Sequence, residues 1–208
     1  MAKIHPGATL TPHFRDFLPA WLAGRPWYAG TGTPVVRPVG YLRFEDPAGE
    51  VGMETHLVEA GGVLYQIPMT YRGAPLSTTD TSGLIATAEH SVLGTRYIYD
   101  AQADPVWREQ LLRIVDTNGM SEPSGKRGFG PADARGVRRS ALPLVREQVT
   151  VEVVRIPTPP PDDAEVAGLL MGTWHTDSGE TASGCLAVVR HRPAGPSGAA
   201  RPSASTPG

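Results

Sequence analysis

The sequence predicts an α+β fold in which an antiparallel sheet is covered on one face by helices. Strand-like segments follow one another along most of the chain, so neighbouring segments can pair without long crossovers. Two amphipathic segments with helical periodicity stand outside this succession. With 208 residues, the chain is long enough to bury a sizeable core.

A first helix is expected to open at Thr11. Its hydroxyl would cap the helix, and Pro12 would take the first helical position, where a missing N–H is tolerated. Because Pro19 removes a donor from the interior, we expect a kinked helix or two short ones. The apolar face would consist of Phe14, Phe17, Leu18, Trp21 and Leu22.

Three strands are expected next, over Val35–Phe44, Val51–Glu59 and Val63–Arg72. In the third, every second side chain is apolar or aromatic, which is typical of a strand with one buried face. The tight connection Ala60-Gly61-Gly62 predicts that the second and third strands form an antiparallel hairpin. Since Pro68 cannot donate to a ladder, it indicates a sheet edge or a bulge, and a free edge there would offer a docking surface.

A fourth strand over Leu93–Asp100 precedes the second helix. Asp104 is a favourable N-cap, Pro105 suits the first turn, and Asn118-Gly119 offers a left-handed stop. The buried face of this helix would consist of Trp107, Leu111, Ile114 and Val115.

The second half of the chain reads as a loop, several strands and a tail. Met120–Arg135 is rich in Gly, Pro, Ser and charge without periodicity, which predicts a mobile loop. Gln148–Ile156 alternates as a strand, and Ala164–Trp174 with Gly184–Arg190 predicts a second hairpin. The composition of Pro193–Gly208 is that of a disordered tail.

Composition narrows the class of protein. A formal net charge of −2 and a pI near 6.3 give no basic field for nucleic acid or an anionic membrane. The single cysteine, Cys185, excludes a disulfide framework and a thiolate metal cluster, and its apolar surroundings predict an inert core thiol. Without a run of about 18 apolar residues or a signal peptide, we expect a cytoplasmic protein, and the Arg, Ala, Gly and Pro usage is typical of a bacterial genome rich in G and C.

The search for catalytic motifs mostly returns absences. The nucleotide-binding glycine motifs, the nucleophile elbow and the zinc-binding helix motif are missing, and the six histidines have no metal-ligand spacing. His175-Thr176-Asp177 is similar to the catalytic loop of kinases, but no Asn follows, and a polar turn explains it. Gly125–Gly130 could cradle a phosphate, although a solvated loop is the simpler interpretation. We therefore expect no catalytic residue, no metal ligand and no cofactor.

An aromatic group consists of Trp21, Trp27, Tyr28 and Tyr71. Such side chains stack on sugar rings in carbohydrate sites, and the same spacing is typical of core packing. Both interpretations stay open at this point.

Three ordered blocks resemble the N-terminal cap domain of bacterial maltokinases. They are W-L-A-G-R-P-W-Y-A-G-T-G at residues 21–32, Y-Q-I-P-M-T-Y-R at residues 65–72 and Y-I-Y-D-A-Q-A-D-P at residues 97–105. The resemblance implies a curved antiparallel sheet packed with two or three helices, similar to cystatin. It also implies a setting in maltose, trehalose and α-glucan metabolism, because the same cap occurs in trehalose synthases fused to a maltokinase.

The departures from the family pattern limit what the resemblance implies. Pro26 stands where the family has an Arg, with Arg25 adjacent, and Thr31 replaces the Lys of the glycine turn. Val137–Gly208 contains no counterpart of the nucleotide-binding or catalytic kinase lobes. We therefore expect a stand-alone cap without phosphoryl transfer.

The expected organisation is a cap-like domain over residues 1–116, a flexible loop over 117–136, a β-rich extension over 137–192 that packs on the cap, and a tail over 193–208. The expected function is that of a non-catalytic accessory or regulatory module of maltose, trehalose and glycogen metabolism, acting through protein–protein contact. One alternative is a binding protein for a glucan or sugar phosphate, and another is a subunit, enzymatic or kinase-like, that is active only with a second chain. The candidate ligand-binding residues are Arg25, Trp27, Tyr28, Tyr71 and Arg72.

Overall fold

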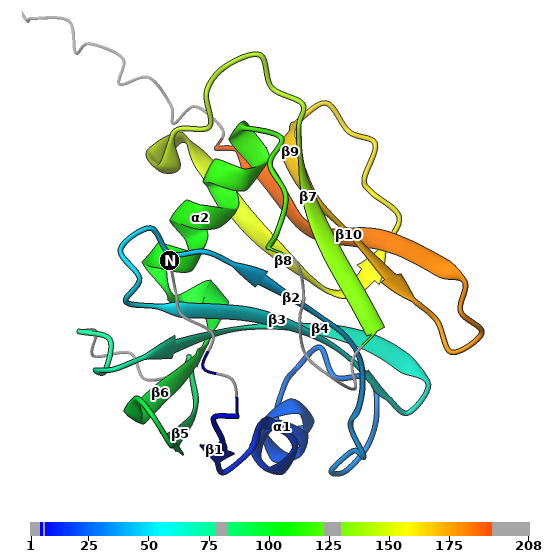
Figure 1. Cartoon of the computed structure of the whole chain (residues 1–208). Coiled ribbons are helices and arrows are strands. Elements are labelled where there is room, and N and C mark those ends of the chain that lie inside the picture. Colours follow the sequence, from blue (N-terminus) through cyan, green and yellow to red (C-terminus); the bar gives the residue numbers. More distant parts are fainter. Residues whose placement is uncertain (1–4, 6, 78–82, 123–129, 193–208) are drawn as a thin grey trace, which may run out of the picture.

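The computed structural model describes residues 5, 7–77, 83–122 and 130–192. In this part of the chain ten strands form one sheet, in the order β1-β5-β6-β4-β3-β2-β7-β9-β10-β8 (Figure 1). No helix among these residues is long and apolar enough to cross a membrane. The predicted tail and most of the predicted phosphate-cradling loop lie outside the described residues.

The elements have the following bounds: β1 Leu10–Thr11, α1 Phe14–Ala23, β2 Arg37–Phe44, β3 Gly52–Ala60, β4 Val63–Arg72, β5 Leu84–His90, β6 Gly94–Asp100, the 3-10 turn η1 Ala101–Ala103, α2 Pro105–Asp116, β7 Gly130–Arg138, the 3-10 turn η2 Arg146–Gln148, β8 Val149–Thr158, β9 Val166–His175 and β10 Thr181–His191.

The predicted α+β class is confirmed, since a curled and mainly antiparallel sheet packs with two helices. The predicted hairpin of β3 and β4 is present, with Ala60 opposite Val63. The exception to the antiparallel pattern is a short parallel ladder between β2 and β7, through which the carboxy-terminal strands continue the same sheet.

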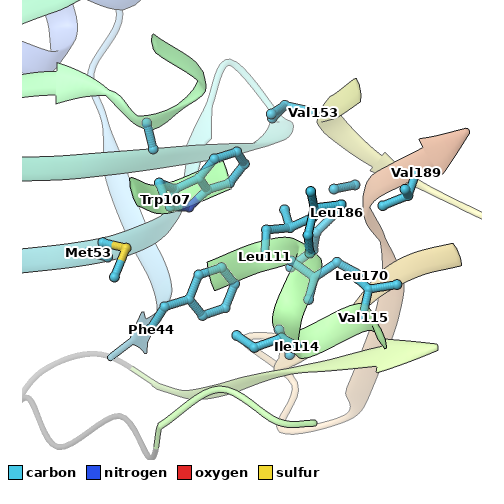
Figure 2. Close-up of a cluster of buried hydrophobic side chains, with 14 of the residues drawn as sticks. Phe44, Met53, Trp107, Leu111, Ile114, Val115, Val153, Leu170, Leu186 and Val189 are labelled. Atoms are coloured by element: carbon cyan, nitrogen blue, oxygen red, sulfur yellow. The ribbon is translucent and has the colours of Figure 1, made fainter. Parts of the chain in front are cut away.

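The sheet is covered on both faces, which corrects the expectation of a single covered face. On the concave side, α2 packs into the largest core, where Trp107 and Leu111 face Phe44 on one side and Leu186 on the other (Figure 2). On the convex side, α1 packs against β3, β4, β5 and β6 (Figure 1). The central strands therefore bury both of their side-chain sets, and a polar residue at their centre must find a partner inside the protein.

The start of α1 differs from the prediction. Thr11 pairs with Glu89 as part of β1, and the N-cap is His13. The backbone N–H of Arg15 donates to His13 Nδ1 at 3.3 Å, and the backbone N–H of His13 donates to the Asp16 carboxylate at 2.8 Å. This reciprocal arrangement is a capping box, in which His13 takes the role that a hydroxyl residue usually has. Pro19 lies inside one continuous helix.

The predicted start and end of α2 are confirmed. The Asp104 carboxylate accepts from the backbone N–H of Val106 at 3.0 Å. At the other end Asn118 has a φ of 50°, and the N–H of Gly119 donates to the carbonyl of Ile114 at 2.8 Å. This is a Schellman-type end, which Asn tolerates because the left-handed conformation strains its short side chain little.

Three strands depart from the prediction. β1 and β5 were not expected, and β7 occupies residues that were expected to be loop. The N–H of Ser121 donates to the carbonyl of Ala134 at 2.8 Å, so the start of that expected loop is also paired. Ala132 and Ala134 point into the core against α2, which explains why this small-residue segment becomes a strand.

Candidate functional site

The geometry of interest is the seam where the carboxy-terminal strands return to β4. Gln66 lies at the centre of β4 and is 2% exposed. Its Nε2 donates to the carbonyl of Val154 on β8 at 2.7 Å and also to the carbonyl of Leu186 on β10. Leu186 lies at the irregularity of β10 between Cys185 and Ala187, so the Gln66 amide satisfies a carbonyl that the bulged ladder leaves over.

Arg155 of β8 makes the second connection across the seam. Its side chain is 9% exposed, and its Nη2 donates to Asp100 Oδ2 at 2.5 Å and to Gln102 Oε1 at 3.1 Å. The guanidinium carbon lies 4.9 Å from the centroid of the Trp27 ring. Arg155 therefore joins β8 to the end of β6, to η1 and to the segment that follows α1.

Arg72 and Asp104 form a bidentate ion pair at the start of α2. The Arg72 Nε and Nη2 donate to the two carboxylate oxygens of Asp104, each at 2.6 Å. Asp104 is also the N-cap of α2, and its side chain is fully buried. The hydrogen bond to Asp104 raises the pKa of Arg72 above its ordinary value, because the buried carboxylate favours the charged guanidinium.

Trp27 and Tyr28 gather around Tyr65, which is fully buried on β4. The ring centroids of Trp27 and Tyr28 lie 6.0 and 5.9 Å from that of Tyr65. The Tyr65 hydroxyl accepts from the backbone N–H of Ala29 at 3.0 Å, which fixes the chain after the aromatic pair. Arg25 lies beside them, with its guanidinium carbon 5.0 Å from the Trp21 ring centroid.

The five predicted ligand residues fall into two places. Arg25, Trp27 and Tyr28 lie together after α1. Tyr71 is six positions along β4 from Tyr65 on the same face, about 20 Å away for an extended strand. Arg72 faces the opposite side of the sheet, where it binds Asp104.

Tyr71 belongs to a polar group around Glu54. The Tyr41 hydroxyl donates to Glu54 Oε1 at 2.7 Å, and His56 Nε2 lies 3.2 Å from Glu54 Oε2. Burial is the main cause that raises the pKa of Tyr41 and of Tyr71, and the hydrogen bonds to Glu54 act in the same direction. Both phenols therefore stay protonated and serve as donors.

The chemistry of these groups is that of structural pairing. The described residues contain no group of three or more His, Cys, Asp or Glu side chains that could hold a metal ion. Burial raises the pKa of the Cys185 thiol to about 11, and the thiol lies against the carbonyl of Ala187, so it is not a nucleophile at neutral pH. Asp177, in the kinase-like tripeptide, pairs with Arg37 at 2.7 Å in an exposed turn.

With this geometry in place, the chain can be compared with known families. Residues 21–104 match the family model of the maltokinase N-terminal cap domain. The predicted resemblance to this cap is thereby confirmed, and we call residues 21–104 the cap segment.

The three blocks of the cap segment meet one another in space. Trp27 of the first block packs on Tyr65 of the second, and Arg72 of the second binds Asp104 of the third. Gln66 and Asp100, from the second and third blocks, bind the carboxy-terminal strands. The block residues thus form a framework within the cap segment and a joint to β8 and β10.

Sequence reasoning missed Arg155 and the role of Gln66. Gln66 carried a weak signal, because it is a polar residue at the centre of a strand that is otherwise apolar on one face. Arg155 carried none, since an Arg in a Val-rich strand is ordinary at a sheet edge. Pro68, expected at an exposed edge, is buried, although the ladder of β4 with β6 begins only at Met69. The stretch around Pro68 is therefore not a free docking surface.

Proposed function

We propose that this chain is a non-catalytic accessory module of maltose, trehalose or α-glucan metabolism that acts by binding another protein. The observation that carries the proposal is the match of residues 21–104 to the cap domain of maltokinase, taken together with the use of the block residues in internal contacts. A module whose motif residues hold its own sheet together presents a surface rather than a reaction centre.

Exposed apolar side chains supply material for such a contact. Val35, in the segment after the first block, is 89% exposed, and Leu142 and Val145 before β8 are 67% and 41% exposed. Val35 follows a stretch that is fixed by the bond from Ala29 to Tyr65, so it projects from an anchored base. Apolar side chains of this size gain free energy when a partner removes them from water.

The direct test is a tagged pull-down from lysate of the source organism, quantified by mass spectrometry. Stoichiometric recovery of an enzyme that acts on maltose, trehalose or α-glucan supports the proposal and identifies the partner. The Val35→Asp variant should recover less of it if the segment after the first block is the contact, with Thr33→Asp as a charge control. Recovery of no such enzyme by the unmodified chain contradicts the proposal.

Sugar binding remains a second candidate because Arg25, Trp27 and Tyr28 lie together and are each half-buried. A glucan stacked on Trp27 would change its fluorescence, since the indole would move from a wet to a drier environment. Titration with maltose and maltoheptaose should then give a saturable signal that the Trp27→Phe variant loses. A titration without saturation contradicts this candidate.

A further inference from the structure

Two arginines meet at the start of β8, where the described chain ends. The Arg108 Nη2, from α2, donates to the carbonyl oxygen of Val149 at 2.8 Å. The Arg192 Nε donates to the same oxygen at 3.2 Å. Two positive groups therefore share one neutral acceptor, and the two nitrogen atoms are held within a few ångströms of each other.

No carboxylate of the described residues lies within ion-pair distance of either arginine. The neighbouring Arg146 is paired with Glu109, and Arg108 also donates to the Arg146 carbonyl at 3.5 Å. Like charges at such a separation repel one another when no anion lies between them. The arrangement is thus electrostatically incomplete.

Two further observations support this conclusion. The Arg108 Nε is buried and has no hydrogen-bond partner among the described residues. The pKa of Arg108 lies below its ordinary value, first because of burial and then because of the positive charges of Arg192 and Arg146. A buried donor without an acceptor costs free energy, which an incoming oxygen atom would recover.

We propose that Arg108 and Arg192 form a binding site for a phosphate group. A phosphate carries close to two negative charges at neutral pH and several acceptor oxygens, which match two guanidinium groups better than a single carboxylate does. Arg146 also lines a depression of about 320 Å³ together with Leu112 and Leu144, which leaves room for the organic part of a phosphomonoester. This site is separate from the candidate sugar contact at Trp27 and does not depend on the proposed accessory function.

The test is a calorimetric titration of the full chain with inorganic phosphate, at constant ionic strength set with chloride. We expect saturable binding, and the Arg108→Gln and Arg192→Gln variants should each raise the dissociation constant about tenfold or more through loss of a charge-assisted hydrogen bond. Glu147→Gln should tighten binding, because the charge of Glu147 opposes the positive field at Arg108. Arg15→Gln, on α1, removes the same charge elsewhere and should leave binding unchanged.

Thermal unfolding keeps the test independent of folding defects. In chloride alone, the Arg192→Gln variant should be at least as stable as the unmodified chain, because the substitution removes a repulsion. In phosphate, only the unmodified chain should gain stability. A parallel titration with glucose 6-phosphate separates the sources: tighter binding than inorganic phosphate indicates a phosphomonoester, and equal binding indicates the phosphate group alone. Failure of the unmodified chain to bind either ligand, or equal binding by the Arg108→Gln and Arg15→Gln variants, overturns the proposal.

Discussion

At the scale of single residues, the cap motif is explained by pairing of buried charges. Arg72 and Asp104 come from two different blocks, 32 positions apart, and each removes the cost of burying the other. The same carboxylate starts α2 by accepting the N–H of Val106. One side chain thus fixes a helix start and a strand end together.

Replacing Asp104 with Asn should therefore be costly. The amide can still cap the helix, but Arg72 would lose its anion while only 20% of its side chain is exposed. We expect the free energy of unfolding to fall by about 3–5 kcal/mol, the usual loss when one partner of a buried pair is removed. Urea unfolding followed by circular dichroism measures it.

The Asp163→Asn variant is the matched control. Asp163 pairs with Arg190 at 2.7 Å, but that pair is exposed to solvent, so its removal should change stability far less. A loss for Asp104→Asn no larger than that of the control would contradict the structural role given to the pair.

Cys185 gives a prediction for pH dependence. The native thiol has a pKa of about 11 against an ordinary value of 9.0, so the unfolded chain loses its proton first as the pH rises. This contribution to stability is therefore complete below pH 9 and is lost progressively between pH 9 and about 11. At pH 8 we expect the native protein to resist a thiol reagent such as DTNB, and the urea-unfolded protein to react. Fast reaction of the native protein would show that the thiol is accessible.

At the scale of elements, α2 and β7 approach closely because Gly136 has no side chain. A Cβ there would meet the carbonyl oxygen of Ile114 and would lie 2.6 Å from the Val115 Cα, both of which are backbone atoms that cannot rotate away. Gly168 of β9 similarly faces the Val115 side chain. Two glycines on neighbouring strands thus let the helix sit deep in the curled sheet.

The Gly136→Ala substitution should lower the free energy of unfolding by about 1–3 kcal/mol, because overpacking forces the backbone of α2 away from β7. Gly24→Ala is a suitable comparison, since its Cβ would have its nearest neighbour at 3.6 Å. Denaturant unfolding of the two variants measures the difference. Equal stability of both variants would indicate that α2 lies farther from β7 than described.

The elements also show what could be predicted from the sequence. The alternation of β4 and the cap of α2 were readable because both are local patterns over a few residues. β5 was missed because its sequence, L-I-A-T-A-E-H, has little strand character, and its pairing with β6 decides its conformation. β7 was missed because small residues suit both a loop and a strand packed under a helix, and only the position of α2 distinguishes them.

At the scale of the whole molecule, the cap segment and the carboxy-terminal strands form one structure. The bond from Gln66 to Val154 joins residues 88 positions apart, and that from Arg155 to Asp100 joins residues 55 apart. Such long-range partners have no signature in a single sequence, which is why the candidate site was predicted only in part. The aromatic pair Trp27 and Tyr28 was recognised from the first block, but the Arg155 contact with Trp27 was not.

The most direct test of this account is native-state hydrogen exchange on the full chain and on the Gln66→Leu variant. If the cap segment and the carboxy-terminal strands are joined as described, the amides of β4, β8 and β10 in the unmodified chain open with the same free energy. In the variant, two buried carbonyls lose their donor, so β8 and β10 should exchange before β4 does. Separate opening of β8 and β10 in the unmodified chain, or an unchanged pattern in the variant, would contradict the account.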